Sequence, residues 1–166
     1  MAARSEQVDN CAFNPLDAVE EVLSLENWDF ARPSDEEIAV QAPGLWCDFS
    51  LFFSWSEELR VLNFSCALDL HVNPESMQSV FELVAKFNAR LWIGHFSIWI
   101  DEGFVMFKHT VRCDGGRIDI EQIRYLVGLA RSECDRYYPA FRFLLLDGKL
   151  PDDAIALSLL ETEGRA

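Results

Sequence analysis

Residues 45–72 read LWCDFSLFFSWSEELRVLNFSCALDLHV, and apolar and polar side chains alternate along this stretch on both sides of a short acidic break at residues 56–58. Such alternation with a period of two is typical of a β-strand that buries one face. The predicted buried face of the first run carries Leu45, Cys47, Phe49, Leu51, Phe53 and Trp55. The predicted buried face of the second run carries Leu62, Phe64, Cys66, Leu68, Leu70 and Val72. Two such strands joined by a short loop predict a long β-hairpin.

The rest of the chain predicts an α+β fold. A second hairpin is expected in residues 96–112, where Phe96 and Ile98 lie on the buried face, and one further strand is expected in residues 36–41. Residues 29–33 fit a connector or a short strand. Helical spacing predicts helices near residues 14–28, 74–91, 119–138 and 151–161, and Pro139 is expected to end the third of them. We therefore expect a flexible N-terminus (residues 1–12) and a single domain (residues 13–166), with about five antiparallel strands, helices packed on one face, and the order α-β-β-β-α-β-β-α-α.

The charge of the chain excludes two classes of partner. The sequence has 28 Asp and Glu residues against 14 Lys and Arg residues, which gives a net charge of −14. Binding to nucleic acids or to anionic membranes depends on clustered basic side chains, so neither partner is expected. The first residues lack the apolar run of a signal peptide. The five cysteines lack zinc-binding spacing, and Cys47, Cys66 and Cys134 are expected to be buried free thiols in a reducing cytoplasm.

No motif in the sequence predicts catalysis. His71, His95 and His109 share no metal-ligand spacing. His71 is expected to be solvated at a strand end, a structural role is favoured for His95, and His109 is expected to lie in the core. The paired acidic residues lie in predicted turns and helix starts, whereas a catalytic carboxylate needs an apolar pocket that raises its pKa. We therefore expect no enzymatic activity, no cofactor and no metal ion.

Aromatic side chains also occur on the opposite, outer face of the predicted sheet. The alternation places five large apolar residues there, among polar ones: Trp46, Phe52, Trp99, Phe104 and Met106. A sheet face that is open to water usually carries polar residues, and grouped exposed aromatic residues usually mark an interface. We therefore predict a partner-binding or self-association site on this face. In the alternative, the last helix or the N-terminal arm covers these side chains.

Three segments resemble a known family. They are LWCD, FSW and CALD in residues 45–69, LWIGHF in residues 91–96, and YYPAF with LET in residues 137–162. These segments are similar to those of the YbjN-like bacterial family of sensory-transduction regulators, and the resemblance covers the chain from about residue 30 to the end. The resemblance implies a fold similar to that of type III secretion chaperones, a bacterial cytoplasmic protein, and no active site to carry over.

Two functions follow from this resemblance. The first is a regulatory module that binds a folded protein partner or a ligand, and the second is an acidic dimeric secretion chaperone that holds an unfolded client. A homodimer is expected in both cases. The apolar stripe from Met77 to Leu91 fits a dimer interface or the protein core equally well.

Overall fold

The computed structural model describes residues 13–113 and 118–163; the N-terminal segment predicted to be flexible lies outside them. Within these ranges, six strands form one antiparallel sheet in the order β1-β2-β3-β4-β6-β5. The strands are β1 (Phe30–Ser34), β2 (Glu37–Pro43), β3 (Asp48–Ser56), β4 (Val61–His71), β5 (His95–Trp99) and β6 (Phe104–Arg112). The helices are α1 (Pro15–Leu25), α2 (Met77–Asn88), α3 (Ile120–Leu145) and α4 (Pro151–Glu163). The element order agrees with the predicted α+β fold, with one strand added.

The alternation in residues 45–72 sets the buried face of the central hairpin. β3 and β4 pair in a register that places Phe53 opposite Phe64, and their rings stack with centroids 4.8 Å apart. The buried positions predicted on these strands and on β5 are confirmed for Phe49, Leu51, Phe53, Phe64, Leu68 and Phe96. Ile98 differs, because it lies near the end of the short edge strand β5 and is only half-buried against the core. The predicted buried positions of Leu45 and Cys47 are wrong, because both residues precede β3: Leu45 is 62% exposed and Cys47 is half-buried.

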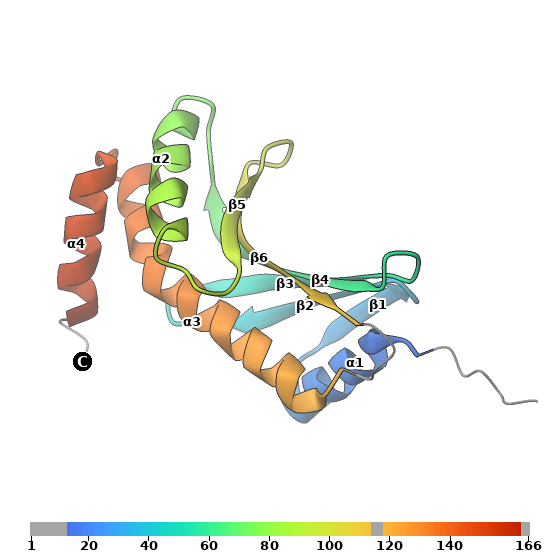
Figure 1. The fold of residues 1–166 in the computed structure, drawn as a ribbon. Coiled ribbons are helices and arrows are strands. Elements are labelled where there is room, and N and C mark those ends of the chain that lie inside the picture. The colour runs from blue at the N-terminus through green and yellow to red at the C-terminus, as the bar shows by residue number, and fades with distance from the viewer. Residues whose placement is uncertain (1–12, 114–117, 164–166) are drawn as a thin grey trace, which may run out of the picture.

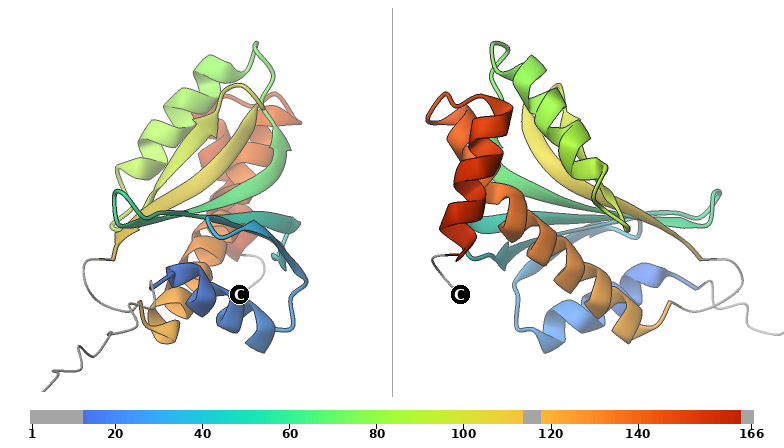
Figure 2. Two further views of the ribbon diagram at one scale, coloured as in Figure 1. Left: turned by 90° about the vertical axis from the view of Figure 1, so that its right-hand side faces the viewer. Right: turned by 60° about the vertical axis from the view of Figure 1, so that its left-hand side comes forward.

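The helices cover one face of the sheet (Figures 1 and 2). α1 and α3 pack against the central strands, α2 packs against β5, and α4 packs against α3 and α2. The Phe87 ring of α2 contacts the rings of Tyr137 and Phe141 of α3, with centroids 4.1 Å and 5.4 Å apart. Of the predicted stripe on the second helix, Val80 and Phe87 are buried in the core, whereas Phe81 is 43% exposed. β5 and β6 rise from the plane of the other strands, and the concave face of the bent sheet is opposite the helices (Figure 1).

The sixth strand is β1, for which the sequence predicts a connector or a short strand. It pairs with β2 at one edge of the sheet, and its register shifts between Ala31 and Ser34. Its side chains are half-buried or exposed, and Pro33 cannot donate a backbone hydrogen bond. A short, irregular strand of this kind carries too little alternation to be distinguished from a connector.

The third helix does not end at Pro139, in contrast to the prediction. α3 continues to Leu145, and Pro139 lies inside it. Proline lacks the N–H group that would bind the carbonyl oxygen four residues earlier, which belongs to Asp135. Trp46 supplies a donor instead: its indole Nε1–H donates to the Asp135 carbonyl oxygen at 2.9 Å, and the Leu45 backbone N–H donates to Asp135 Oδ1 at 2.7 Å. The loop before β3 thus supports the helix at its proline.

The second helix begins later than predicted. Asn73 Oδ1 accepts a hydrogen bond from the Ser76 backbone N–H at 2.8 Å, which stabilises a turn, and α2 starts only at Met77. At the other end of α2, the side chain of Asn88 bonds to both backbone groups of Phe96 on the edge strand β5. The Nδ2 atom donates to the carbonyl oxygen at 3.0 Å, and Oδ1 accepts from the N–H at 2.7 Å. This carboxamide therefore occupies backbone groups that an edge strand leaves open.

Candidate functional site: a cleft on the open face of the sheet

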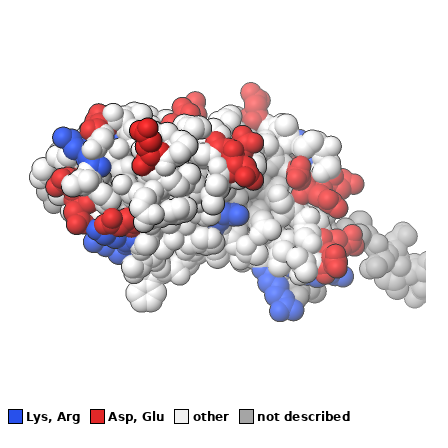
Figure 3. All heavy atoms as spheres, turned by 90° about the horizontal axis from the view of Figure 1, so that it is seen from above, with Lys and Arg blue, Asp and Glu red and all other residues white. Residues whose placement is uncertain are grey.

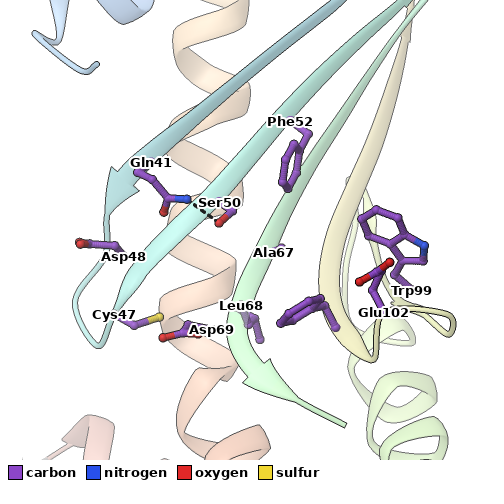
Figure 4. Close-up of a pocket in the computed structure, with 11 residues that line it drawn as sticks. Gln41, Cys47, Asp48, Ser50, Phe52, Ala67, Leu68, Asp69, Trp99 and Glu102 are labelled. Carbon is purple, nitrogen blue, oxygen red and sulfur yellow. Dashed lines mark hydrogen bonds between the residues drawn. The ribbon is translucent and has the colours of Figure 1, made fainter. Parts of the chain in front are cut away.

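The concave face of the sheet holds a cleft of about 820 Å³ (Figure 4). Its apolar lining residues are Phe52, Ala67, Leu68, Trp99 and Phe104. Its polar lining residues are Gln41, Cys47, Asp48, Ser50, Asp69 and Glu102. They come from β2, β3, β4 and the β5–β6 hairpin, and from the loop before β3. A cleft of this size lies within the range of about 300–1,000 Å³ that is usual for ligand-binding pockets.

The topology of the sheet creates this cleft. β6 pairs with β4 rather than extending the sheet beyond β5, and the register between them shifts between Ala67 and His71. The turn of the β5–β6 hairpin is held against the end of β4, because the Val72 backbone N–H donates to the Gly103 carbonyl oxygen at 2.7 Å. Gly103 has a φ of +71°, and a Cβ atom there would lie 2.8 Å from His71 Nε2. The turn that carries Glu102 is therefore packed closely against β4.

Three of the five predicted outer-face residues line the cleft. Phe52 is 38% exposed and Trp99 is 47% exposed, while Phe104 is half-buried and packs edge-on against His71 with ring centroids 6.0 Å apart. Met106 is only 7% exposed and pairs with the lining residue Ala67, so it lies next to the cleft without being accessible. The structure thus brings the aromatic residues of two hairpins together on one open surface.

Trp46 is not part of this surface, so its predicted position on the outer face is wrong. β3 begins at Asp48, and the alternation of the strand does not extend back to residue 46. Trp46 instead lies in the preceding loop, half-buried, with its ring stacked on Tyr138 of α3 at a centroid distance of 6.4 Å. Its hydrogen bond to Asp135 fixes it on the helical side of the sheet.

Carboxylates give the cleft its charge. Asp48, Asp69 and Glu102 line it, and its lining contains no Lys or Arg. In the sequence, the two aspartates alternate with the buried positions of residues 45–72, and Glu102 follows Asp101 and precedes Gly103 in a turn-like stretch, but no local pattern brings the three together. The alternation of β3 and β4 was a signal for the aspartates; the approach of Glu102 depends on the pairing of β4 with β6, for which no local signal exists.

The cleft has few groups suited to catalysis. Cys47 and Ser50 are its lining nucleophiles. Burial raises the pKa of the Cys47 thiol, which disfavours the reactive thiolate. The Ser50 hydroxyl accepts a hydrogen bond from the Gln41 side-chain amide at 2.8 Å. No histidine is among the lining residues. His109 is half-buried elsewhere in β6, and burial, followed by the nearby His95, lowers its pKa. In the part of the chain that the structure describes, no group of three or more His, Cys, Asp or Glu side chains could hold a metal ion. This arrangement is suited to binding through apolar contact and negative charge.

The last helix does not cover the aromatic residues. α4 packs against α3 and α2, on the side of the molecule opposite the open face (Figure 1). The N-terminal arm, the other predicted cover, lies outside the described residues. Among the helices that are described, none is long and apolar enough to cross a membrane.

Comparison with known proteins places the chain in a family. The family model of YbjN, described as "Putative bacterial sensory transduction regulator", matches residues 15–143. The chain belongs to the YbjN family. A similar solved structure is that of YbjN from E. coli, described as "a putative transcription regulator". The two chains are 15% identical, with a TM-score of 0.52 over 72% of this chain and 85% of the E. coli chain, a likeness that supports the fold alone. No curated protein matches the sequence.

Proposed function

We propose that this YbjN-family protein is a non-enzymatic regulatory module that binds a protein partner through the open face of its sheet. One observation carries the proposal: Phe52, Trp99 and Phe104 come from separate strands and meet in one open cleft. Large aromatic residues are where binding energy concentrates in protein interfaces. A soluble protein that leaves Trp99 47% exposed beside Phe52 has a surface suited to contact with another molecule.

A regulatory role is also supported by the chemistry of the cleft. An acid–base enzyme needs a titratable group tuned by an apolar pocket and placed against a second group. The cleft combines three carboxylates at its surface with a thiol whose pKa is raised. We therefore place the protein among binding proteins of the bacterial cytoplasm and expect no catalysed reaction.

The second candidate is an acidic chaperone with a fold like that of type III secretion chaperones. It is favoured by exposed leucines at the C-terminal end of the described chain: Leu146, Leu150 and Leu160 are each more than 60% exposed. Exposed apolar side chains of this kind can contact an unfolded apolar segment. A chaperone should suppress aggregation of an unfolded client, whereas a regulator should bind a folded partner and leave client aggregation unchanged.

The proposal is tested by comparing which proteins the wild type and a cleft variant retain. Wild-type protein, the double variant Phe52→Thr/Trp99→Thr, and the control Phe81→Ala are immobilised and cross-linked in a lysate of the source bacterium. Phe81 lies on α2 and is 43% exposed, so the control removes a similarly exposed aromatic ring from another surface. A partner bound through the cleft is retained by the wild type and the control and lost from the double variant. Equal retention by all three proteins would contradict the proposal.

A further inference from the structure

We infer that the cleft binds a basic apolar segment of its partner, in which a Lys or Arg lies next to a large apolar side chain. This inference rests on the proposed function and adds the chemistry of the bound segment. The apolar side chain would pack on Phe52, Trp99 and Phe104. The cation would lie beside one of the carboxylates that flank this surface, which belong to Asp48, Asp69 and Glu102.

The carboxylates stand on two sides of the aromatic surface. Figure 4 shows Asp48 and Asp69 on the side of the loop before β3, and Glu102 with Trp99 on the side of the β5–β6 hairpin. None of the three carboxylates forms an ion pair with another described residue. A cation in the cleft would therefore not have to displace an existing one.

The negative charge selects among possible occupants. A second copy of this chain carries the same net charge of −14. If the clefts of two copies faced each other, the carboxylates of one would lie against those of the other. Like charges placed together across an interface weaken association, and nucleic acid is repelled for the same reason. In the space-filling view of Figure 3, acidic side chains are spread across the visible surface and basic ones are fewer. The surrounding charge thus also favours the approach of a basic segment.

The aromatic residues of the cleft also favour a positively charged occupant. A cation within about 6 Å of an aromatic ring face is attracted by the ring, most strongly by Trp. Trp99 and Glu102 lie on the same side of the cleft, so an aromatic face and a carboxylate are available to one cation (Figure 4). The volume of about 820 Å³ admits a few side chains of an extended segment and not a folded domain.

A library of short synthetic peptides tests the inference without knowledge of the partner. Wild-type protein is used to select bound peptides, and their affinities are measured by fluorescence anisotropy at low and high salt. The selected peptides should be enriched in Lys or Arg next to an apolar residue, and their binding should weaken as salt screens the charges. In the variant Asp48→Asn/Asp69→Asn/Glu102→Gln, the dissociation constant should rise about tenfold or more.

The control removes the same charge from another surface. Glu36→Gln/Glu57→Gln/Glu58→Gln neutralises three exposed carboxylates that do not line the cleft, and it should bind the peptides with unchanged affinity. The inference is overturned if the library yields no bound peptide, if the selected peptides lack positive charge, or if both triple variants bind alike. If selected peptides lose affinity only in Phe52→Thr/Trp99→Thr, the proposed binding surface stands and the charge chemistry is wrong. If neither cleft variant changes affinity, the proposed surface fails as well.

Discussion

At the scale of single residues, Trp46 joins the loop before β3 to the middle of the longest helix. Pro139 leaves the Asp135 carbonyl oxygen without its helical donor, and the Trp46 indole N–H donates to it at 2.9 Å. Burial raises the pKa of the Asp135 carboxyl group, while the hydrogen bond from Leu45 opposes this shift. Two distant parts of the chain, residues 45–46 and residues 135–139, therefore depend on each other at this point.

The variant Trp46→Phe keeps an aromatic ring and removes the indole donor. Loss of a donor to a partly buried carbonyl should lower the free energy of unfolding by about 1–3 kcal/mol, measured by urea denaturation. In a Pro139→Ala background, residue 139 regains its N–H, which can donate to the Asp135 carbonyl oxygen. Trp46→Phe should therefore lower the free energy of unfolding by less in this background. The change in ring size is common to both backgrounds and cancels in the double-mutant cycle. Equal effects in the two backgrounds would show that the hydrogen bond does not support the proline.

His109 provides a pH-dependent contribution to stability. Burial lowers the pKa of His109 below its ordinary value of 6.5, and the nearby His95 lowers it further. The unfolded chain therefore binds a proton more readily than the folded one. The free energy of unfolding should fall as the pH drops below about 6.5, until it passes the lower folded pKa. This fall should be smaller in His109→Gln, as measured by urea denaturation between neutral and mildly acidic pH; an identical pH profile in the variant would contradict the assignment.

At the scale of the elements, the two faces of the β3–β4 hairpin have opposite roles. Phe64 is 1% exposed and stacks on Phe53, whereas Phe52 on the other face is 38% exposed. Truncation of a fully buried Phe typically destabilises a protein by about 3–5 kcal/mol. Phe64→Ala should therefore lose several kcal/mol, and Phe52→Thr should change the denaturation midpoint little. If Phe64→Ala kept the wild-type midpoint, the assignment of the buried face would be wrong.

The strength of the alternation decided which elements could be predicted from the sequence. The long runs that became β3 and β4 fixed both the hairpin and the face that Phe49 and Phe64 bury. β1 could not be distinguished from a connector because it is short and irregular. α3 was predicted too short because Pro139 is a local signal, whereas the donor that compensates for it comes from Trp46, far away in the sequence.

The candidate site was predictable only in part. Phe52, Trp99 and Phe104 follow from alternation within single strands, and they do line the cleft. Trp46 was misplaced because the alternation was extended beyond the start of β3. The acidic lining could not be predicted from local pattern, because Glu102 reaches the cleft that Asp69 lines only after β6 pairs with β4.

At the scale of the whole molecule, the acidic charge bears on self-association. A homodimer remains a prediction of the family resemblance, although Val80 and Phe87 of the α2 stripe that could have formed its interface are buried in the core. Two chains with a net charge of −14 repel each other, and salt screens that repulsion. Light scattering at micromolar concentration should therefore give twice the chain mass of 19.0 kDa, with a larger dimer fraction at moderate than at low salt. A mass near one chain at both salt concentrations would exclude the dimer.

The hydrogen bonds of the Asn88 side chain bear on how the chain folds while it is being synthesised. The hydrogen-bonded partners Asn88 and Phe96 are only eight residues apart in the sequence. The contact can therefore form while the chain is still being synthesised, before β6 has left the ribosome. At that stage the outward-facing backbone groups of Phe96, in the first half of β5, are already bonded to Asn88. A nascent chain protected in this way has fewer means of pairing with its neighbours on the same messenger RNA.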